Sequence, residues 1–289
     1  MASDGGLINL GDLSKPATVL VEKVCNAVGI LYEPTRARRI ARAEADSERI
    51  RALARIELSQ IEERALERLV HQEARKQENI ESITEQAARA LPPEAKTESL
   101  DEDWIAHFFK QCDTVSDKEM QSLWSKLLAG EATTPGTFSK RTVDFVSTID
   151  KRDAALFTQF AQFVWMFGEP VPMIFEAEGE IYKRNGVSFS VLKHLDAIGL
   201  ISFESLAGYQ TTGTTKQFLF HYFGTPTLLE FPTDGNHTIQ LGHALLTTIG
   251  KELVAVCGAQ RNQEFYEYVV GRWREQAILV NGTGKSPET

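Results

Sequence analysis

A long run without glycine or proline, residues 36–91, limits how this chain can fold more than any other feature. The run is rich in alanine, glutamate and arginine, which favour helix, and Pro92–Pro93 ends it. The pattern predicts one long helix, or two, which we treat as a helical stalk over residues 36–93. At about 1.5 Å per residue an unbroken helix would extend roughly 80 Å. A small core cannot stabilise such a rod, so part of its surface needs a partner.

Apolar residues follow the stalk in a narrow, alanine-rich stripe with irregular spacing. Its members are Ile50, Ala54, Leu58, Ile61, Ala65, Leu69, Ile80, Ile83, Ala87 and Leu91. Such a stripe favours a coiled coil or an antiparallel hairpin with closely packed helices, and it indicates a homo-oligomer. The alternative is an intramolecular hairpin within a monomer. The residues predicted to mediate self-association are Ile50, Leu58, Ile61, Leu69, Ile80 and Ile83.

The segment before the stalk, residues 1–35, contains one apolar helix over residues 16–33. Ser14 is placed to cap this helix, Pro16 suits its first turn, and Pro34 ends it. Four arginines follow at once, without an intervening acid. An apolar helix beside an arginine cluster can lie on an anionic membrane or against a protein partner. The alternative is a helix packed on its own protein. The predicted contact residues are Leu20, Val24, Val28, Leu31, Arg36, Arg38, Arg39 and Arg42.

Residues 98–168 predict a compact helical domain. Within it, Ser116 is expected as an N-cap with Glu119 completing a capping box, and Gly130 as the residue that ends the same helix. A Pro-Gly turn at residues 135–136 then leads into a third helix, capped by Ser139 or Thr137. The strongly apolar stretch 151–167 is expected to be the fourth helix.

Residues 169–280 predict a smaller α+β domain that resembles a winged helix. A helix from Ser188 to a stop at Gly199 precedes a strand, and a long hairpin follows in which Phe218, Phe220 and Tyr222 share one face. Residues 281–289 are expected to form a disordered tail. The predicted fold class is therefore mainly α, with an N-terminal apolar helix, a stalk, a helical domain and a winged-helix-like α+β domain.

Composition excludes several functional classes. The net charge of −9 argues against nucleic-acid binding through a globally basic surface. The three cysteines, Cys25, Cys112 and Cys257, are far apart and form no CxxC motif, so neither a disulfide framework nor a zinc site is expected. The sequence shows neither a signal peptide nor an apolar segment long enough to span a bilayer. We expect a cytoplasmic protein that can also lie peripherally at the inner membrane.

Chemical motifs are weak throughout. The stretch around Gly130 and Lys140 lacks the spacing of a phosphate-binding loop, and the histidines do not form a ligand pair. The helix starting at Ser188 offers only Lys193 and His194 for base contacts, which is poor for DNA readout. We therefore expect no cofactor, no metal and no catalytic residue. Glu176, Glu178 and Glu180 are interpreted as solvated loop acids.

Residues 116–157, "SDKEMQSLWSKLLAGEATTPGTFSKRTVDFVSTIDKRDAALF", resemble the pattern SDxExxxLWxKLLAGE…PGxFSxRT of a bacterial family of unknown function. The stretches "LYEPTRARRIARAEAD", "EARKQENIESI" and "LTTIGKEL" are also similar to that family. Related Trp-x-x-Leu-Leu-Ala-Gly-Glu segments occur in the abortive-infection alpha group, which is linked to phage defence. The resemblance supplies no reaction or catalytic residue. The matching residues, which we interpret as structural, are Trp124, Leu127, Leu128, Gly130, Glu131, Pro135, Phe138 and Arg141.

The sequence thus favours a non-enzymatic, self-associating protein that docks on a membrane surface or a protein partner, in the setting of phage defence. Two alternatives remain open. One is a nucleic-acid-linked regulator that uses the winged-helix-like domain. The other is a hydrolase or nuclease whose site is assembled from scattered acids.

Overall fold

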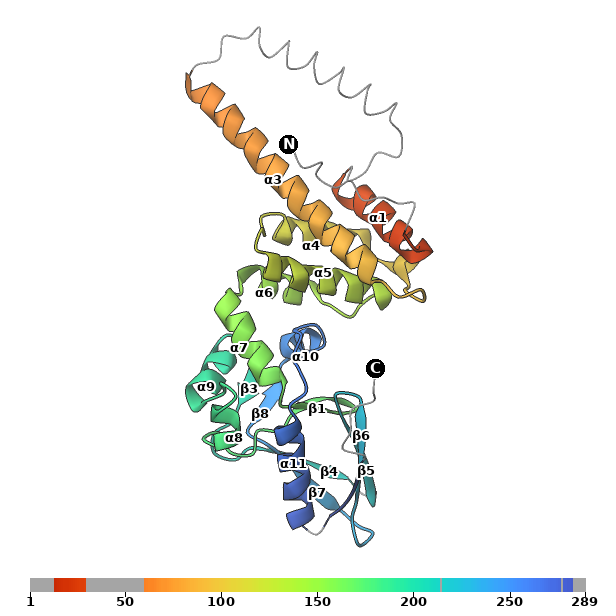
Figure 1. Ribbon diagram of the computed structural model, residues 1–289, viewed down its shortest axis with the longest axis vertical. Helices are drawn as coiled ribbons and strands as arrows, with labels where there is room; N and C mark the ends of the chain where they lie inside the picture. Colours follow the sequence, from red (N-terminus) through yellow and green to blue (C-terminus); the bar gives the residue numbers. More distant parts are fainter. Residues whose placement is uncertain (1–12, 30–59, 214, 277, 283–289) are drawn as a thin grey trace. The chain divides into compact units, whose positions relative to one another are not determined.

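The computed structural model describes residues 13–29, 60–213, 215–276 and 278–282 (Figure 1). The chain divides into two compact units, Met1–Ser147 and Thr148–Thr289. The described residues are mainly helical, with a small antiparallel β region in the second unit. The predicted fold class is confirmed at this level.

The first unit is helical. Its described elements are α1 (Lys15–Val28), α3 (Gln60–Ala90), the short 3-10 helix η2 (Thr97–Ser99), α4 (Glu102–Cys112), α5 (Lys118–Thr133) and α6 (Lys140–Thr148). The C-terminal half of α3 packs on α5, and α1 packs on α3, α4 and η2 (Figure 1). Phe108 lies at the centre of the core, in edge-to-face contact with Trp124 at a centroid distance of 5.1 Å.

Helix α1 is part of this core. The side chain of Ser14 accepts a hydrogen bond from the Ala17 amide, as the sequence predicts for the cap. Leu20 and Val24 are fully buried. The interpretation of this helix as one packed on its own protein therefore describes the observed structure.

The start of α5 differs from the expected capping box. Asp117, not Ser116, is the N-cap, and its carboxylate accepts from the amides of Glu119 and Met120. The Ser116 hydroxyl instead accepts hydrogen bonds from two residues of α3, Arg75 and Asn79. A tertiary contact thus shifts the cap by one residue.

The second unit contains all the described strands. Its elements are α7 (Lys151–Ala161), β1 (Val164–Phe167), β2 (Glu169–Pro172), α8 (Glu180–Lys183), α9 (Phe189–Ala197), β3 (Ile201–Phe203), β4 (Tyr209–Gly213), β5 (Gln217–Tyr222), β6 (Thr225–Glu230), β7 (His237–Gly242), β8 (Ala244–Leu246), α10 (Thr248–Val254), α11 (Gln263–Glu275) and β9 (Leu279–Gly282). A five-stranded antiparallel sheet has the order β2-β1-β5-β6-β9. Two further antiparallel pairs join β3 to β8 and β4 to β7.

β7 pairs with β4, and the stretch 216–232 by itself forms a hairpin of β5 and β6. The two-residue turn between them has positive φ at both Phe223 and Gly224, which suits the twist of a tight hairpin. Phe218, Phe220 and Tyr222 are buried on one face of β5, as the alternation predicts. The Trp165 ring stacks on the Tyr222 ring at a centroid distance of 4.8 Å.

The predicted fourth helix is wrong in its second half, because α7 ends at Ala161 and residues 164–167 form β1. β1 pairs with β2 and β5, so α7 and β1 lie in the second unit rather than in the helical domain 98–168. The continuous apolar run fits a buried strand as well as a buried helix, and pairing with β5 decides the outcome. The described parts of the predicted segments 1–35 and 36–93, which are α1 and α3, lie in the same unit as α4 and α5. Leu279–Gly282 is a strand, while residues 283–289 of the predicted tail lie outside the described part.

Buried tyrosines make the second unit sensitive to alkali. Burial raises the pKa of Tyr222 to about 12, and burial also raises the pKa of Tyr182 well above its ordinary value of 10. The fold therefore disfavours both phenolates, and the stability present below pH 10 is lost as the pH rises toward the folded-state pKa. In a phenolate absorbance titration we expect these two of the six tyrosines to ionise only as the unit unfolds. Ionisation of all six near pH 10 with the circular dichroism unchanged would contradict this.

Candidate interaction surface on helix α3

The Pro-Gly turn after α5 is a structural joint. Glu131, only 4% exposed, accepts hydrogen bonds through its two carboxylate oxygens from the amides of Gly136 (2.6 Å) and Phe138 (2.8 Å). Ser139 caps α6 by accepting from the amide of Thr142, as the sequence predicts. A buried carboxylate that accepts from two backbone amides fixes the turn.

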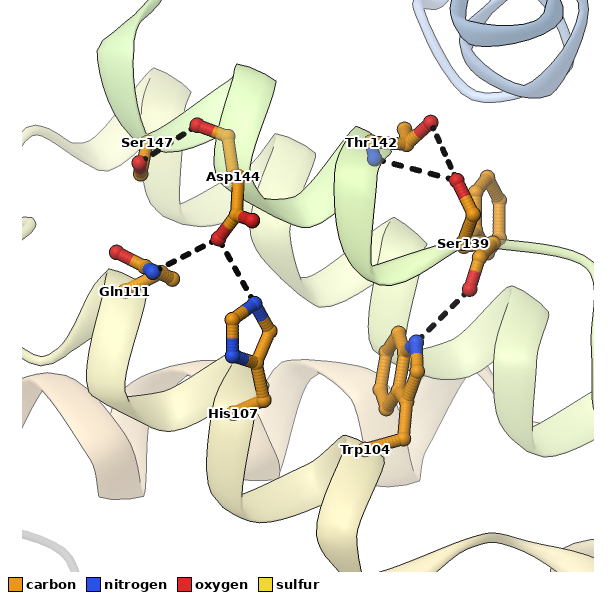
Figure 2. A network of polar contacts seen from close by, with 8 residues as sticks. Trp104, His107, Gln111, Ser139, Thr142, Asp144 and Ser147 are labelled. Carbon is orange, nitrogen blue, oxygen red and sulfur yellow. Dashed lines mark hydrogen bonds and ion pairs between the residues drawn. The ribbon is translucent and has the colours of Figure 1, made fainter.

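Gly130 lies inside α5 and does not end it, contrary to the sequence prediction, since the helix continues to Thr133. Glycine is needed there because a Cβ would lie 2.7 Å from the Phe138 ring. The Trp104 indole donates to the Phe138 carbonyl oxygen at 2.8 Å, which Figure 2 shows. Trp124, Leu127 and Leu128 are also buried. Arg141, by contrast, is exposed, so the structural interpretation of the pattern does not extend to this residue.

A histidine and a carboxylate lie together beside this joint. His107 Nε2 and Gln111 Nε2 each lie 2.8 Å from Asp144 Oδ1 (Figure 2). The Ser147 hydroxyl donates to the Asp144 backbone carbonyl and is not directed at the imidazole. Burial raises the pKa of the Cys112 thiol, which keeps it protonated and unreactive. These contacts link α4 to α6 and do not form a nucleophile–base pair.

The loop acids that a hydrolase or nuclease site could use form local ion pairs. Glu176 pairs with Arg272 at 2.8 Å and Glu178 with Lys183 at 2.7 Å. Within the described ranges, no group of three or more histidine, cysteine, aspartate or glutamate side chains could hold a metal ion. On α9, Lys193 lies 3.5 Å from Asp196, and His194 lies 2.7 Å from Asp153.

The predicted membrane-contact residues fall into two groups. In α1, Leu20 and Val24 are fully buried in the first unit and Val28 is partly exposed, so the first two do not form a surface. The others lie outside the described residues: Leu31, Arg36, Arg38, Arg39 and Arg42. The described part of α1 therefore presents its apolar stripe to its own core.

The predicted self-association residues are divided along α3. Ile61 is 69% exposed and Leu69 is 53% exposed, whereas Ile80 is partly exposed and Ile83 is fully buried. Ile50 and Leu58 lie outside the described residues. The stripe is therefore covered in the C-terminal half of the helix and uncovered in the N-terminal half.

Two residues that the sequence analysis did not include belong to this uncovered face: Leu66 and Val70, at 38% and 62% exposed. Eighteen residues of an α-helix make five full turns, so residues that far apart lie on the same face. The residues eighteen positions after Ile61, Ala65, Leu66, Leu69 and Val70 are Asn79, Ile83, Thr84, Ala87 and Ala88, which are the buried residues of α3. Extending the stripe by this rule could have identified Leu66 and Val70.

We call the face formed by Ile61, Ala65, Leu66, Leu69 and Val70 the open face of α3. It continues the face that packs on the rest of the first unit, but the helix extends past α1, α4 and α5 (Figure 1). Every residue from Gln60 to Arg75 is exposed. Large apolar side chains on a stretch of helix that none of the described elements covers mark a surface for interaction.

The structure thus defines a mainly helical protein with a small β region and an open helical face. The chain belongs to the family described as "Protein of unknown function (DUF2806)", which matches residues 63–270. The match includes the described α3 from Glu63 onward and ends within α11. No curated protein and no solved structure matches the chain.

Among the described helices, none is both long enough and apolar enough to cross a membrane.

Proposed function

We propose that this protein is a non-enzymatic assembly protein and that the open face of α3 binds a second copy of the chain. One observation carries the proposal: the face that is buried from Asn79 to Ala88 stays apolar from Ile61 to Val70, where the described part of the chain leaves it exposed. A helix derives most of its stability from packing of its apolar face, so an extended half without packing favours a partner.

The charge pattern selects the kind of partner. Around the open face, the acidic residues Glu62, Glu63, Glu67 and Glu73 are equal in number to the basic residues Arg64, Arg68, Arg75 and Lys76. A second α3 therefore meets no net charge, whereas attraction to anionic lipid requires an excess of basic residues. A coiled-coil arrangement of two such helices is the geometry that we propose, with the apolar side chains at the seam.

The buried area supports a measurable affinity. Fully burying a leucine, isoleucine or valine side chain contributes about 1.5–3 kcal/mol, and each copy offers Ile61, Leu66, Leu69 and Val70. These side chains are partly covered already, and association has its own entropic cost. We therefore expect a concentration-dependent equilibrium rather than a permanent oligomer.

The variant Leu69→Glu tests this proposal. We expect the wild-type chain to exceed its monomer mass of 32.3 kDa in light scattering at high concentration, and the variant to remain a monomer. A buried glutamate at the seam without a cationic partner costs several kcal/mol. Gln60→Glu is the matched control. Gln60 lies on the same side of the helix as Glu78, eighteen residues later, and Glu78 is exposed rather than packed on the first unit, so position 60 lies outside the open face. The control should associate like the wild type.

Other occupants of the open face are outcomes of the same experiment. A wild-type chain that stays monomeric at the highest concentration contradicts the proposal. If it instead co-sediments with anionic vesicles and Leu69→Glu does not, the open face binds lipid. Equal association of Leu69→Glu and the wild type would show that copies meet elsewhere.

For the second unit, we propose that α8, α9 and the paired strands β4 and β7 form a winged-helix-like arrangement used for packing rather than for base readout. The contacts of Lys193 with Asp196 and of His194 with Asp153 support this, since an exposed recognition helix offers unpaired donors to phosphates. Adding a DNA duplex at low salt should leave the measured mass unchanged. A salt-dependent mass increase would favour the nucleic-acid alternative.

The resemblance to the abortive-infection alpha group supports phage defence as the setting of this assembly. If that setting is right, cells that express the wild-type chain should resist plating by a sensitive phage, and cells that express Leu69→Glu should not. Equal protection by both chains would show that phage defence does not require association through the open face.

A further inference from the structure

A polar hollow of about 390 Å³ lies between α3 and the start of α5, within the first unit. Its lining comes from two stretches that the sequence analysis singled out, "EARKQENIESI" and the beginning of "SDKEMQSLW", together with one further turn of α3. The lining residues are His71, Ala74, Arg75, Glu78, Asn79, Ser116, Lys118 and Gln121. Neither the open face of α3 nor the joint at Glu131 includes these side chains.

The floor of the hollow is a pair of buried amides. Asn79 and Gln121 are only 4% and 1% exposed. Gln121 Nε2 donates to Asn79 Oδ1 at 3.0 Å and to the Val115 carbonyl oxygen at 2.9 Å, and Asn79 Nδ2 donates to the Asp113 carbonyl oxygen at 2.8 Å. Because these groups have partners, the floor is rigid and holds α3 in a fixed position against the turn before α5.

The rim carries basic groups held in place by neutral partners. Arg75 Nε donates to the Ser116 hydroxyl at 2.8 Å, and Lys118 Nζ donates to Gln121 Oε1 at 3.2 Å. In the described ranges, neither cation makes a salt bridge. The nearby Asp113 carboxylate is already 3.8 Å from Lys76 Nζ.

We propose that this hollow binds the phosphate group of a small molecule. The guanidinium of Arg75 uses Nε for Ser116, which fixes its plane and leaves its terminal amino groups for an anion. Lys118 and His71 supply donors from other directions, and a phosphate has several peripheral oxygens that accept from different sides. The volume leaves room for an organic part beside the phosphate.

Glu78 should affect phosphate affinity in the opposite direction to the basic residues. It is the acidic residue in the lining, and it is exposed. A carboxylate beside a bound phosphate repels it, so this side chain limits the affinity for a bare phosphate ion. A ligand hydroxyl or amine directed at Glu78 would relieve that repulsion, which makes a phosphorylated metabolite a better ligand than the free ion.

The test uses inorganic phosphate as the probe, titrated into the full chain by calorimetry at constant ionic strength with chloride as the counter-ion. We expect binding with a Kd in the millimolar range or tighter, weakened by about tenfold in Arg75→Gln and in Lys118→Gln, since each variant removes a charge-assisted hydrogen bond to the anion. Glu78→Gln should bind phosphate more tightly than the wild type. Lys126→Gln is the control, because Lys126 is exposed on α5 and does not line the hollow.

Three results would overturn the proposal. The first is an absence of phosphate binding by both the wild type and Glu78→Gln. The second is equal weakening by Lys126→Gln and Arg75→Gln, which would show non-specific charge attraction. The third is unchanged affinity in Arg75→Gln with the circular dichroism of the wild type. The opposite sign expected for Glu78→Gln separates binding from misfolding, since a misfolded variant does not gain affinity.

Discussion

The double variant Leu20→Ala, Val24→Ala is expected to lose most of the stability of the first unit. Both side chains are fully buried, and α1 packs on α3, α4 and η2. A buried leucine truncated to alanine costs about 2–5 kcal/mol, and the valine adds a smaller amount. The total approaches the stability of a typical domain, which is about 5–15 kcal/mol.

Hydrogen exchange measured by mass spectrometry gives the local readout. Amides of α4 and α5 should lose protection in the double variant, while those of β5 and β6 in the other unit should keep it. The control changes Glu22 and Asn26, which are exposed on the same helix, to alanine and should leave protection unchanged. Wild-type protection in the Leu20, Val24 variant would mean that α1 is not held by the core, and the predicted membrane contact would regain support.

The same packing affects deletion experiments. Removing residues 1–42 takes away a helix whose buried face includes Ala17 and Val21 as well as the two residues above. The remaining chain would expose the apolar surface that α1 covers. A loss of membrane binding on deletion therefore reports unfolding as readily as it reports a lipid contact, and substitutions of exposed residues are the better test.

Glu131→Ala is expected to destabilise the first unit by about 3–5 kcal/mol. The substitution leaves the buried amide of Phe138 without its acceptor, which costs about 1–3 kcal/mol, whereas the amide of the exposed Gly136 can bond to water. It also opens a cavity beneath the turn, because Glu131 is itself buried. The Trp104–Phe138 hydrogen bond should weaken as the turn loosens.

Urea unfolding followed by circular dichroism measures this loss, as a lower midpoint for the transition of the first unit. Lys126→Ala changes an exposed position on the same helix and should alter the free energy of unfolding by no more than about 0.5 kcal/mol. Glu131→Gln keeps one acceptor oxygen and should lie between the two. A wild-type midpoint in Glu131→Ala would show that the turn does not depend on the carboxylate.

Periodicity predicted many elements because local physics decides them. Ser14 and Ser188 cap their helices as expected, and the alternation in β5 buries Phe218 and Phe220 on one side. Serine at a helix start and alternating apolar residues in a strand act over a few residues of chain, so neighbouring segments do not change their effect.

The errors lie where distant residues compete for the same groups. Arg75 occupies the Ser116 hydroxyl, so Asp117 caps α5. β5 and β2 pair with residues 164–167, so that stretch is a strand. The Phe138 ring approaches Gly130, so the glycine serves close packing instead of ending a helix. Arg75 and β5 lie far along the chain from Ser116 and β1, so a window of neighbouring residues does not contain them.

By itself the sequence determined that this protein has a long helix with an apolar stripe, because the spacing of side chains and the absence of helix breakers are local properties. Only the tertiary structure decided which part of that stripe is free. α1, α4 and α5 cover the turns from Asn79 to Ala88 and do not reach those from Ile61 to Val70. A stripe indicates that burial is needed, but which half of it is buried depends on the lengths and positions of other helices. The hollow at Arg75 follows the same logic, since its cations and its buried amides come from two helices that only folding brings together.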